Sequence, residues 1–153
     1  GRVSVVTPTV ESRQSFHQTL YTCFTAQSWQ DKELVVVETF HYRHSAFLAQ
    51  QAVKDNRLCY ATFQLPFGED WSIGLKRNLC AHLATGEFLA HFDDDDLYAP
   101  LYLATMVKNL KASWTLGTKL SSWFTYDRDT DAFYYCAPEL IERERHGASD
   151  LLL

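Results

Sequence analysis

Four consecutive aspartates, Asp93 to Asp96, are the residues of this sequence best suited to chemistry. Hard divalent cations such as Mg²⁺ and Mn²⁺ prefer oxygen ligands, and they often bind through one or two carboxylates together with substrate phosphates. Adjacent carboxylates repel each other unless a cation offsets the repulsion. The run therefore predicts a cation site. A solvated acidic loop, or the cap of a following helix, is the alternative.

The D-x-D spacing within this run suggests a division of labour between its carboxylates. One carboxylate can bind the metal while another reaches a ribose hydroxyl. A metal held in this way bridges to a diphosphate and neutralises the charge that grows as the diphosphate leaves. The chemistry that fits the run is therefore the binding and departure of a nucleoside diphosphate.

The elements that must position the aspartates follow from the hydrophobic pattern. Strands are expected at residues 3–6, 34–37, 58–63 and 88–92, and two more within 119–137 around a turn at 127–131. Helices are expected at 11–28, 46–53 and 100–111. Another helix has Ser72 as its N-cap and Gly86 as its C-terminal stop. This alternation predicts a three-layer α/β/α domain with a mainly parallel sheet.

Ligands of such sheets bind at the carboxyl ends of the strands. Three polar segments fall at those ends in the predicted order of elements. They are residues 7–9, residues 38–39 and the aspartate run. We therefore expect these segments to form one site.

Composition narrows the class of protein. The chain has 153 residues, is 46% hydrophobic and carries a net charge of −5, which predicts a single domain over residues 1–153 and argues against a nucleic-acid binder. No apolar run reaches the ~18 residues of a membrane span, and no segment of this sequence resembles a signal peptide. We expect a cytoplasmic location, although a chain that begins at Gly1 is also compatible with an excised domain of a larger or anchored protein.

Several segments resemble, in order, those of the family 2 glycosyltransferases. Residues 3–9 (VSVVTPT) resemble the first strand and nucleotide loop of that family, and residues 33–37 (ELVVV) are similar to its second strand. Residues 74–78 (GLKRN) followed by 84–88 (ATGEF) resemble a "G…RN…A.GE" segment. Residues 92–100 (FDDDDLYAP) are similar to its metal-binding strand end. The resemblance covers about residues 2–110.

This resemblance implies a GT-A fold and an inverting transfer of sugar to an unknown acceptor hydroxyl. It also implies a nucleoside-diphosphate sugar donor, with a UDP-sugar favoured, and Mn²⁺ or Mg²⁺ as cofactor. Asp95 would be the principal metal ligand, assisted by Asp93. The residues implied along the nucleotide-sugar are Thr7, Pro8, Thr9, Glu38, Arg77, Asn78, Asp93 and Asp94. For Arg77, an ordinary exposed helical arginine is the alternative.

Two departures from the family pattern matter. Glu38 stands where the family usually has a base-contacting aspartate. In addition, no acidic pair suited to be the catalytic base follows the metal site, so we expect the acceptor-binding part to lie outside this chain. Residues 112–153 lie beyond the segments that resemble the family. The later carboxylates left without a role are Asp127, Asp129, Asp131, Glu139, Glu142, Glu144 and Asp150.

Three hypotheses remain open at this point. The first is a glycosyltransferase. The second is a module that binds the nucleotide-sugar without catalysing transfer. The third is an unrelated α/β domain whose acidic loop binds Ca²⁺ structurally. Dependence on nucleotide separates the first two from the third, and turnover separates the first from the second.

Overall fold

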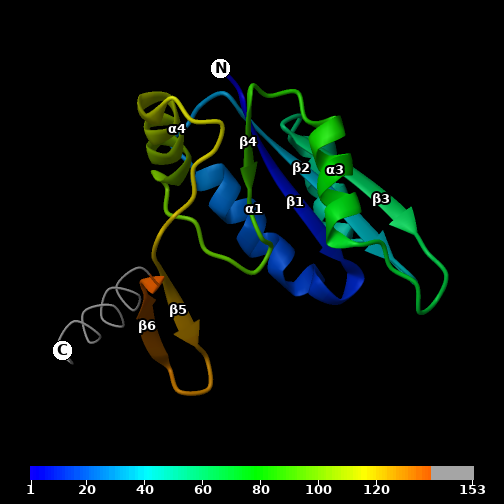
Figure 1. The fold of residues 1–153 in the computed structure, drawn as a ribbon. Coiled ribbons are helices and arrows are strands. Elements are labelled where there is room, and N and C mark those ends of the chain that lie inside the picture. Colours follow the sequence, from blue (N-terminus) through cyan, green and yellow to red (C-terminus); the bar gives the residue numbers. More distant parts are fainter. Residues whose placement is uncertain (139–153) are drawn as a thin grey trace, which may run out of the picture. The chain divides into compact units, whose positions relative to one another are not determined.

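The computed structural model describes residues 1–138, which fall into a compact unit of residues 1–109 and a second unit that begins at Leu110 (Figure 1). The first unit contains a four-stranded sheet in the order β3-β2-β1-β4, and every neighbouring pair is parallel. Its strands are β1 (Val3–Val10), β2 (Lys32–Phe40), β3 (Leu58–Gln64) and β4 (Phe88–His91). The single domain expected over residues 1–153 extends beyond the described range and stays a prediction.

Helices cover both faces of this sheet (Figure 1). The helices are α1 (His17–Ala26), α2 (Ala46–Lys54), α3 (Ile73–Leu83) and α4 (Tyr102–Ser113). On one face α1, α2 and the first turns of α4 contribute buried Leu20, Leu48 and Leu103 to a common core. On the other face α3 packs buried Cys80 against Val6 and Val35. The predicted three-layer arrangement with a parallel sheet is confirmed.

The first strand and helix differ from the expected boundaries. Strand β1 continues past Pro8, which lies in register with Val37, and ends only at Val10. A 3₁₀ helix, η1 (Glu11–Phe16), follows it, and the α-helix begins at His17 rather than near residue 11. The carboxylate of Glu11 accepts the backbone N–H groups of His41 and Tyr42 at 2.9 and 3.0 Å. These hydrogen bonds connect η1 to the loop after β2.

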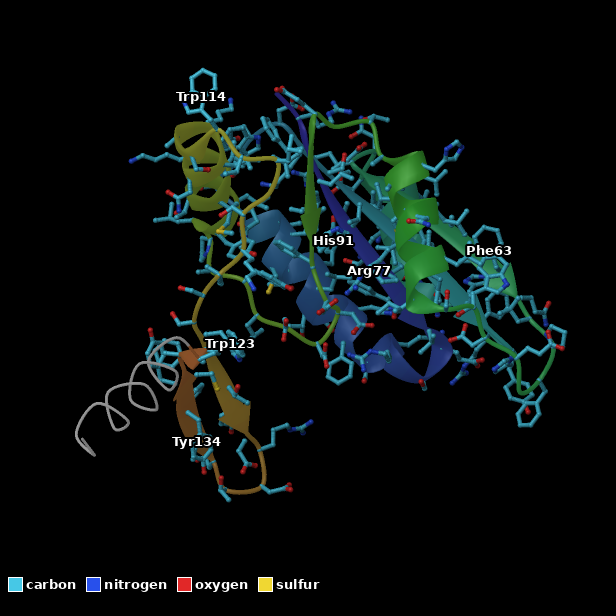
Figure 2. All side chains as sticks on the ribbon, viewed as in Figure 1. Phe63, Arg77, His91, Trp114, Trp123 and Tyr134 are labelled. Atoms are coloured by element: carbon cyan, nitrogen blue, oxygen red, sulfur yellow. The ribbon has the colours of Figure 1, made fainter. Side chains whose placement is uncertain are left out.

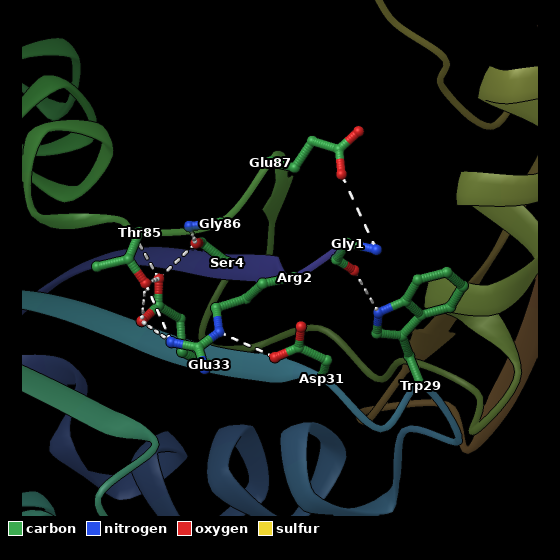
Figure 3. Close-up of polar contacts among 9 residues, drawn as sticks. All are labelled: Gly1, Arg2, Ser4, Trp29, Asp31, Glu33, Thr85, Gly86 and Glu87. Carbon is green, nitrogen blue, oxygen red and sulfur yellow. Dashed lines mark hydrogen bonds and ion pairs between the residues drawn. The ribbon is translucent and has the colours of Figure 1, made fainter.

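A buried polar cluster holds the start of β4 against the sheet (Figure 3). Ser4 donates to Glu33 at 2.5 Å, and the backbone N–H of Thr85 donates to the same carboxylate at 2.6 Å. Gly86 N–H donates to the Ser4 hydroxyl at 2.8 Å. A side chain at Gly86 would place its Cβ 2.8 Å from backbone atoms of β1. Gly86 is therefore required for close approach and not as the helix stop, which is Ala84.

The second unit contains an antiparallel hairpin of β5 (Trp123–Asp127) and β6 (Ala132–Cys136), as the sequence predicts. Aromatic side chains along both strands are exposed, among them Trp123 and Tyr134 (Figure 2). The carboxylates of Glu139, Glu142, Glu144 and Asp150 lie outside the described residues. Over residues 1–138, no helix is both long and apolar enough to cross a membrane.

Candidate donor-binding site

The aspartate run begins two residues after the end of β4, in a turn that packs on the core. Buried Phe92 stacks on Tyr98 with ring centroids 3.6 Å apart, and the Tyr98 hydroxyl accepts the backbone N–H of Asp93 at 2.9 Å. The Gln27 side chain, buried at the end of α1, donates to the backbone carbonyl of Ala99 at 2.9 Å. The turn is thus fixed to the core on both sides, and the carboxylates within it have defined positions.

A cavity of about 380 Å³ opens at the carboxyl edge of the sheet. Its volume falls within the range of small-molecule sites, about 300–1,000 Å³. It is lined from β1 and η1, from the loop before α3, from α3 itself and from the aspartate run. The lining residues are Pro8, Thr9, Val10, Arg13, Asp70, Trp71, Ile73, Lys76, Arg77, Asp93, Asp94 and Asp95.

Asp94 is the buried member of the aspartate run, with its side chain only 3% exposed. One carboxylate oxygen accepts the Thr9 hydroxyl at 2.6 Å, and the other accepts Arg13 Nε at 2.7 Å. Because the Thr9 hydroxyl has donated its proton to Asp94, its oxygen accepts from Nε2 of buried His17, 3.0 Å away. Burial lowers the pKa of His17, which favours the neutral ring, and the hydrogen bond to Thr9 then places the ring proton on Nε2. A continuous polar chain therefore runs from α1 to the cavity.

Asp93 and Asp95 are the exposed members of the run that line the cavity, with side chains 51% and 45% exposed. Arg77 Nη2, from α3, donates to Asp93 Oδ1 at 3.2 Å, and Figure 2 shows Arg77 between α3 and the end of β4. Arg13 Nη2 lies 2.7 Å from Asp95 Oδ2. Arg77 Nε is buried without a hydrogen-bond partner among the described residues.

The loop before α3 brings a second charged pair to the cavity. Lys76, almost fully buried, contacts both oxygens of Asp70 at 3.0 and 3.1 Å, and Thr39 donates to the same carboxylate at 2.7 Å. Burial raises the pKa of Asp70, but the bonds from Thr39 and Lys76 outweigh burial and the net shift is downward. Trp71, beside it, packs on Phe63 with centroids 4.7 Å apart. This end of the cavity therefore combines an ionised carboxylate with an aromatic ring.

Glu38 is not brought to the cavity, although the sequence placed it along the nucleotide. It is fully buried in β2, where it accepts Gln14 Nε2 at 2.7 Å, the backbone N–H of Ser45 at 3.0 Å, and the Tyr60 hydroxyl in a short contact. Burial, and then the bond to this carboxylate, raise the pKa of Tyr60. The longer side chain turns back into the protein, so Glu38 anchors the start of α2 instead of facing a ligand.

Two further predicted residues also lie away from the cavity lining. Thr7 is fully buried two residues before Thr9, on the same face of β1, and its hydroxyl has no partner among the described residues. Asn78 is exposed on α3, one position past Arg77 and therefore about 100° further round the helix. The predicted residues that do line the cavity are Pro8, Thr9, Arg77, Asp93, Asp94 and Asp95.

Sequence reasoning missed four polar or aromatic residues of the lining: Arg13, Asp70, Trp71 and Lys76. Arg13 lies in η1, directly after β1, and Asp70 and Trp71 lie in the loop that follows β3. The rule that ligands bind at the carboxyl ends of parallel strands applies to these loops as well. Lys76 directly precedes Arg77 within the segment already singled out. Their positions after strand ends, or beside Arg77, therefore indicated these residues, but the predicted site contained only residues of the family motifs.

The cavity offers oxygen ligands to a divalent cation, but not a complete set. Across residues 1–138, no three acidic, histidine or cysteine side chains come together as a metal site. Asp93 and Asp95 are accessible, and hard cations accept such ligands when substrate phosphates complete the shell. Each of these carboxylates already contacts an arginine. The residues therefore fit a metal that binds together with a diphosphate better than a metal that binds alone.

A parallel sheet with helices on both faces and a charged cavity at its carboxyl edge is the arrangement of open α/β domains that bind ligands at their strand ends. Within that class, the chain belongs to glycosyl transferase family 2, whose model matches residues 4–135. No curated protein sequence matches the chain.

Solved structures show the same fold. S. aureus TarS (residues 1–349) is similar with a TM-score of 0.63 at 18% identity, over 79% of this chain and 39% of TarS. Its complex with UDP gives a TM-score of 0.61 at 20% identity, over 73% of this chain and 32% of that one. The mannosyltransferase PcManGT from Pyrobaculum calidifontis, in complex with GDP-Man and Mn²⁺, gives 0.58 at 19% identity over 93% of this chain. The chain spans 46% of PcManGT, so it spans less than half of each of these proteins.

Proposed function

We propose that this chain binds the donor of a metal-dependent, inverting glycosyltransferase and transfers a sugar from a nucleoside-diphosphate sugar, with a UDP-sugar favoured, to an acceptor hydroxyl. The observation that carries the proposal is the cavity at the carboxyl edge of the sheet, in which accessible Asp93 contacts Arg77 and accessible Asp95 contacts Arg13. Structures of similar fold hold UDP, or GDP-Man with Mn²⁺, and these ligands match the chemistry of the cavity.

The residues divide the work within this proposal. Asp95 and Asp93 would hold Mn²⁺ or Mg²⁺, and when bound the cation supplies positive charge to the departing diphosphate. The Arg77 guanidinium, whose side chain is 39% exposed and lines the cavity, would donate to a phosphate or ribose oxygen. Trp71 offers an aromatic face to the nucleobase, and Asp70 an acceptor for its N–H groups. Thr9 holds Asp94 in place and keeps the run in register with β1.

Calorimetry with UDP, first with Mn²⁺ and then with EDTA, tests the proposal. We expect UDP to bind at least tenfold more tightly with Mn²⁺, because the cation bridges its phosphates to Asp95. Asp95→Asn should abolish this gain, since an amide is a neutral and weaker ligand for a hard cation. Asp96→Asn is the matched control, because Asp96 does not line the cavity, and it should retain the gain. Equal UDP affinity in Mn²⁺ and EDTA would contradict metal-bridged binding.

One observation favours a second candidate, a module that binds the donor without catalysing transfer. Every carboxylate that lines the cavity is paired with a cation: Asp70 with Lys76, Asp93 with Arg77, and Asp94 and Asp95 with Arg13. A carboxylate engaged by a cation must give up that contact before its oxygen can accept a proton from an acceptor, so none of the four is suited to act as the base. Release of UDP from a UDP-sugar across a panel of acceptors, measured beside UDP binding, separates transfer from binding alone.

A further inference from the structure

Arg13 makes the strongest charged contacts in the cavity. Its Nε and Nη2 atoms lie 2.7 and 2.6 Å from Asp94 Oδ1, and Nη2 lies 2.7 Å from Asp95 Oδ2. One guanidinium therefore bridges two successive carboxylates. The group also lies over the Phe16 ring, 5.3 Å from its centroid. The planar guanidinium thus presents fixed N–H donors to two carboxylates, a geometry that the single ammonium group of a lysine does not provide.

The two carboxylates that Arg13 bridges differ in their freedom. Asp94 is buried and is held independently by Thr9 on its other oxygen. Asp95 is 45% exposed, and within the described part of the chain Arg13 is the one cation that forms an ion pair with it. The Arg13 side chain is itself 38% exposed. The bond to Asp95 can therefore break while the bonds to Asp94 remain.

The other two cations of the cavity cannot take this role. Lys76 is almost fully buried and is held by Asp70 and by Thr39. Arg77 contacts Asp93 through a single bond of 3.2 Å. Arg13 alone among the three contacts Asp95, the carboxylate assigned to the metal.

We propose that Arg13 is a built-in counter-cation that shares Asp95 with the divalent metal, so that metal binding displaces the guanidinium from Asp95 and frees it for the diphosphate. This inference rests on the proposed function. In the protein alone, the guanidinium offsets the repulsion between Asp94 and Asp95. A metal that arrives alone must compete with it. A metal that arrives with a diphosphate offers Nη2 a new anionic partner, so metal and nucleotide bind cooperatively.

Binding of Mn²⁺ alone, measured by the paramagnetic resonance signal of the free ion, tests the competition directly. Arg13→Gln should bind Mn²⁺ at least tenfold more tightly than the unaltered chain, because the competing cation is gone. The matched control is Arg43→Gln, which removes the same charge from an exposed position outside the cavity lining. It should change Mn²⁺ affinity less than twofold. Equal or weaker Mn²⁺ binding by Arg13→Gln overturns the proposal.

A second pair of variants covers the case in which Arg13→Gln does not fold because buried Asp94 loses its partner. Asp94→Asn removes that buried charge, and the comparison is then Asp94→Asn with Asp94→Asn/Arg13→Gln. The double variant should bind Mn²⁺ at least fivefold more tightly, since Asp95 is released from Arg13. Equal affinity of the two would overturn the proposal in the same way.

Titration of UDP in the same samples separates this proposal from the proposed function. In the unaltered chain Mn²⁺ should strengthen UDP binding at least tenfold, and in Arg13→Gln this gain should be at least threefold smaller, because the bridge through Asp95 remains but the contribution of Arg13 is lost. A chain that binds no UDP contradicts the donor-site function, while the Mn²⁺ result still decides the role of Arg13. UDP binding with an undiminished gain in Arg13→Gln supports the donor site and overturns the counter-cation.

Discussion

Asp94 and Glu38 are both buried carboxylates at the carboxyl edge of the same sheet, yet their surroundings differ. Asp94 follows β4, and a guanidinium that reaches solvent compensates its charge. Glu38 lies within β2, and its three partners are a side-chain amide, a backbone N–H and a phenol. The first carboxylate borders the cavity and the second does not.

The difference shows how one sheet edge serves two purposes. A cation that holds a buried charge and also reaches solvent can exchange its other contacts for a ligand, as we propose for the contact between Arg13 and Asp95. A buried charge enclosed by neutral donors has no such exchange, and its hydrogen bonds fix local structure. We therefore assign Asp94 to the donor site and Glu38 to the support of α2, and the predictions below separate the two roles.

The largest effect on stability should come from Glu38→Ala. This change leaves Gln14, the Ser45 N–H and Tyr60 without their acceptor in a buried place, which should cost about 3 kcal/mol of unfolding free energy. UDP affinity, measured well below the melting temperature, should be unchanged. Urea denaturation and calorimetry give the two numbers, with exposed Glu69→Ala as control. A large loss of UDP affinity in the folded variant would show that Glu38 contributes to donor binding.

Asp94→Asn should have a smaller effect on stability and a larger one on binding. The amide oxygen still accepts a hydrogen bond from Arg13, but the NH₂ group faces the Thr9 hydroxyl. The hydroxyl must then accept a hydrogen bond from this NH₂ group and donate its own hydrogen to His17. Loss of the charged bonds should cost about 2 kcal/mol of unfolding free energy and weaken UDP binding at least tenfold in Mn²⁺. Denaturation and calorimetry check both. Unchanged UDP affinity would show that Asp94 has a structural role and does not contribute to UDP binding.

The sequence predicted the layers, the parallel sheet and the aspartate run, because these depend on hydrophobic period and on strand ends. It did not predict which carboxylates face the cavity. From the sequence alone, repulsion between neighbouring carboxylates is the same argument for each residue from Asp93 to Asp96. In the structure, their burial and their arginine partners differ. The position of Arg13 depends on the 3₁₀ turn after β1, and no periodicity in the sequence signals that turn. The inward turn of Glu38 depends on Tyr60, which is distant in sequence.

The chain from His17 to Asp94 predicts a pH effect of intermediate size. Burial lowers the pKa of His17 below its ordinary value of 6.5, so the unfolded chain binds a proton that the folded chain does not. The stability that this difference supplies is complete above pH 6.5 and is lost as the pH falls from there toward the lowered pKa. Between pH 7.5 and 5.5 the unaltered chain should lose about 1 kcal/mol more than His17→Gln. Parallel slopes for the two proteins would contradict a neutral His17.

The smallest effect should come from Asp96→Asn. Burial, and then the neighbouring Asp93 and Asp95, raise the pKa of Asp96, and the structure gives it a tyrosine hydroxyl rather than a cation. Its charge therefore destabilises the fold at neutral pH, and the penalty disappears as the pH falls through the raised pKa. At pH 7 the variant should be more stable by about 0.5 kcal/mol, a modest gain because the residue is solvated. Thermal unfolding at pH 7 checks the sign, and a loss of stability would be contrary to it.

A crystal structure of the chain with UDP and Mn²⁺ tests the central claim most directly, because the anomalous signal of manganese locates the cation. We expect a peak within about 2.5 Å of an Asp95 carboxylate oxygen and of diphosphate oxygens, with Arg13 Nη2 moved from Asp95 to a phosphate. UDP in the cavity with no peak at the aspartates, or a peak at other residues, would contradict the account.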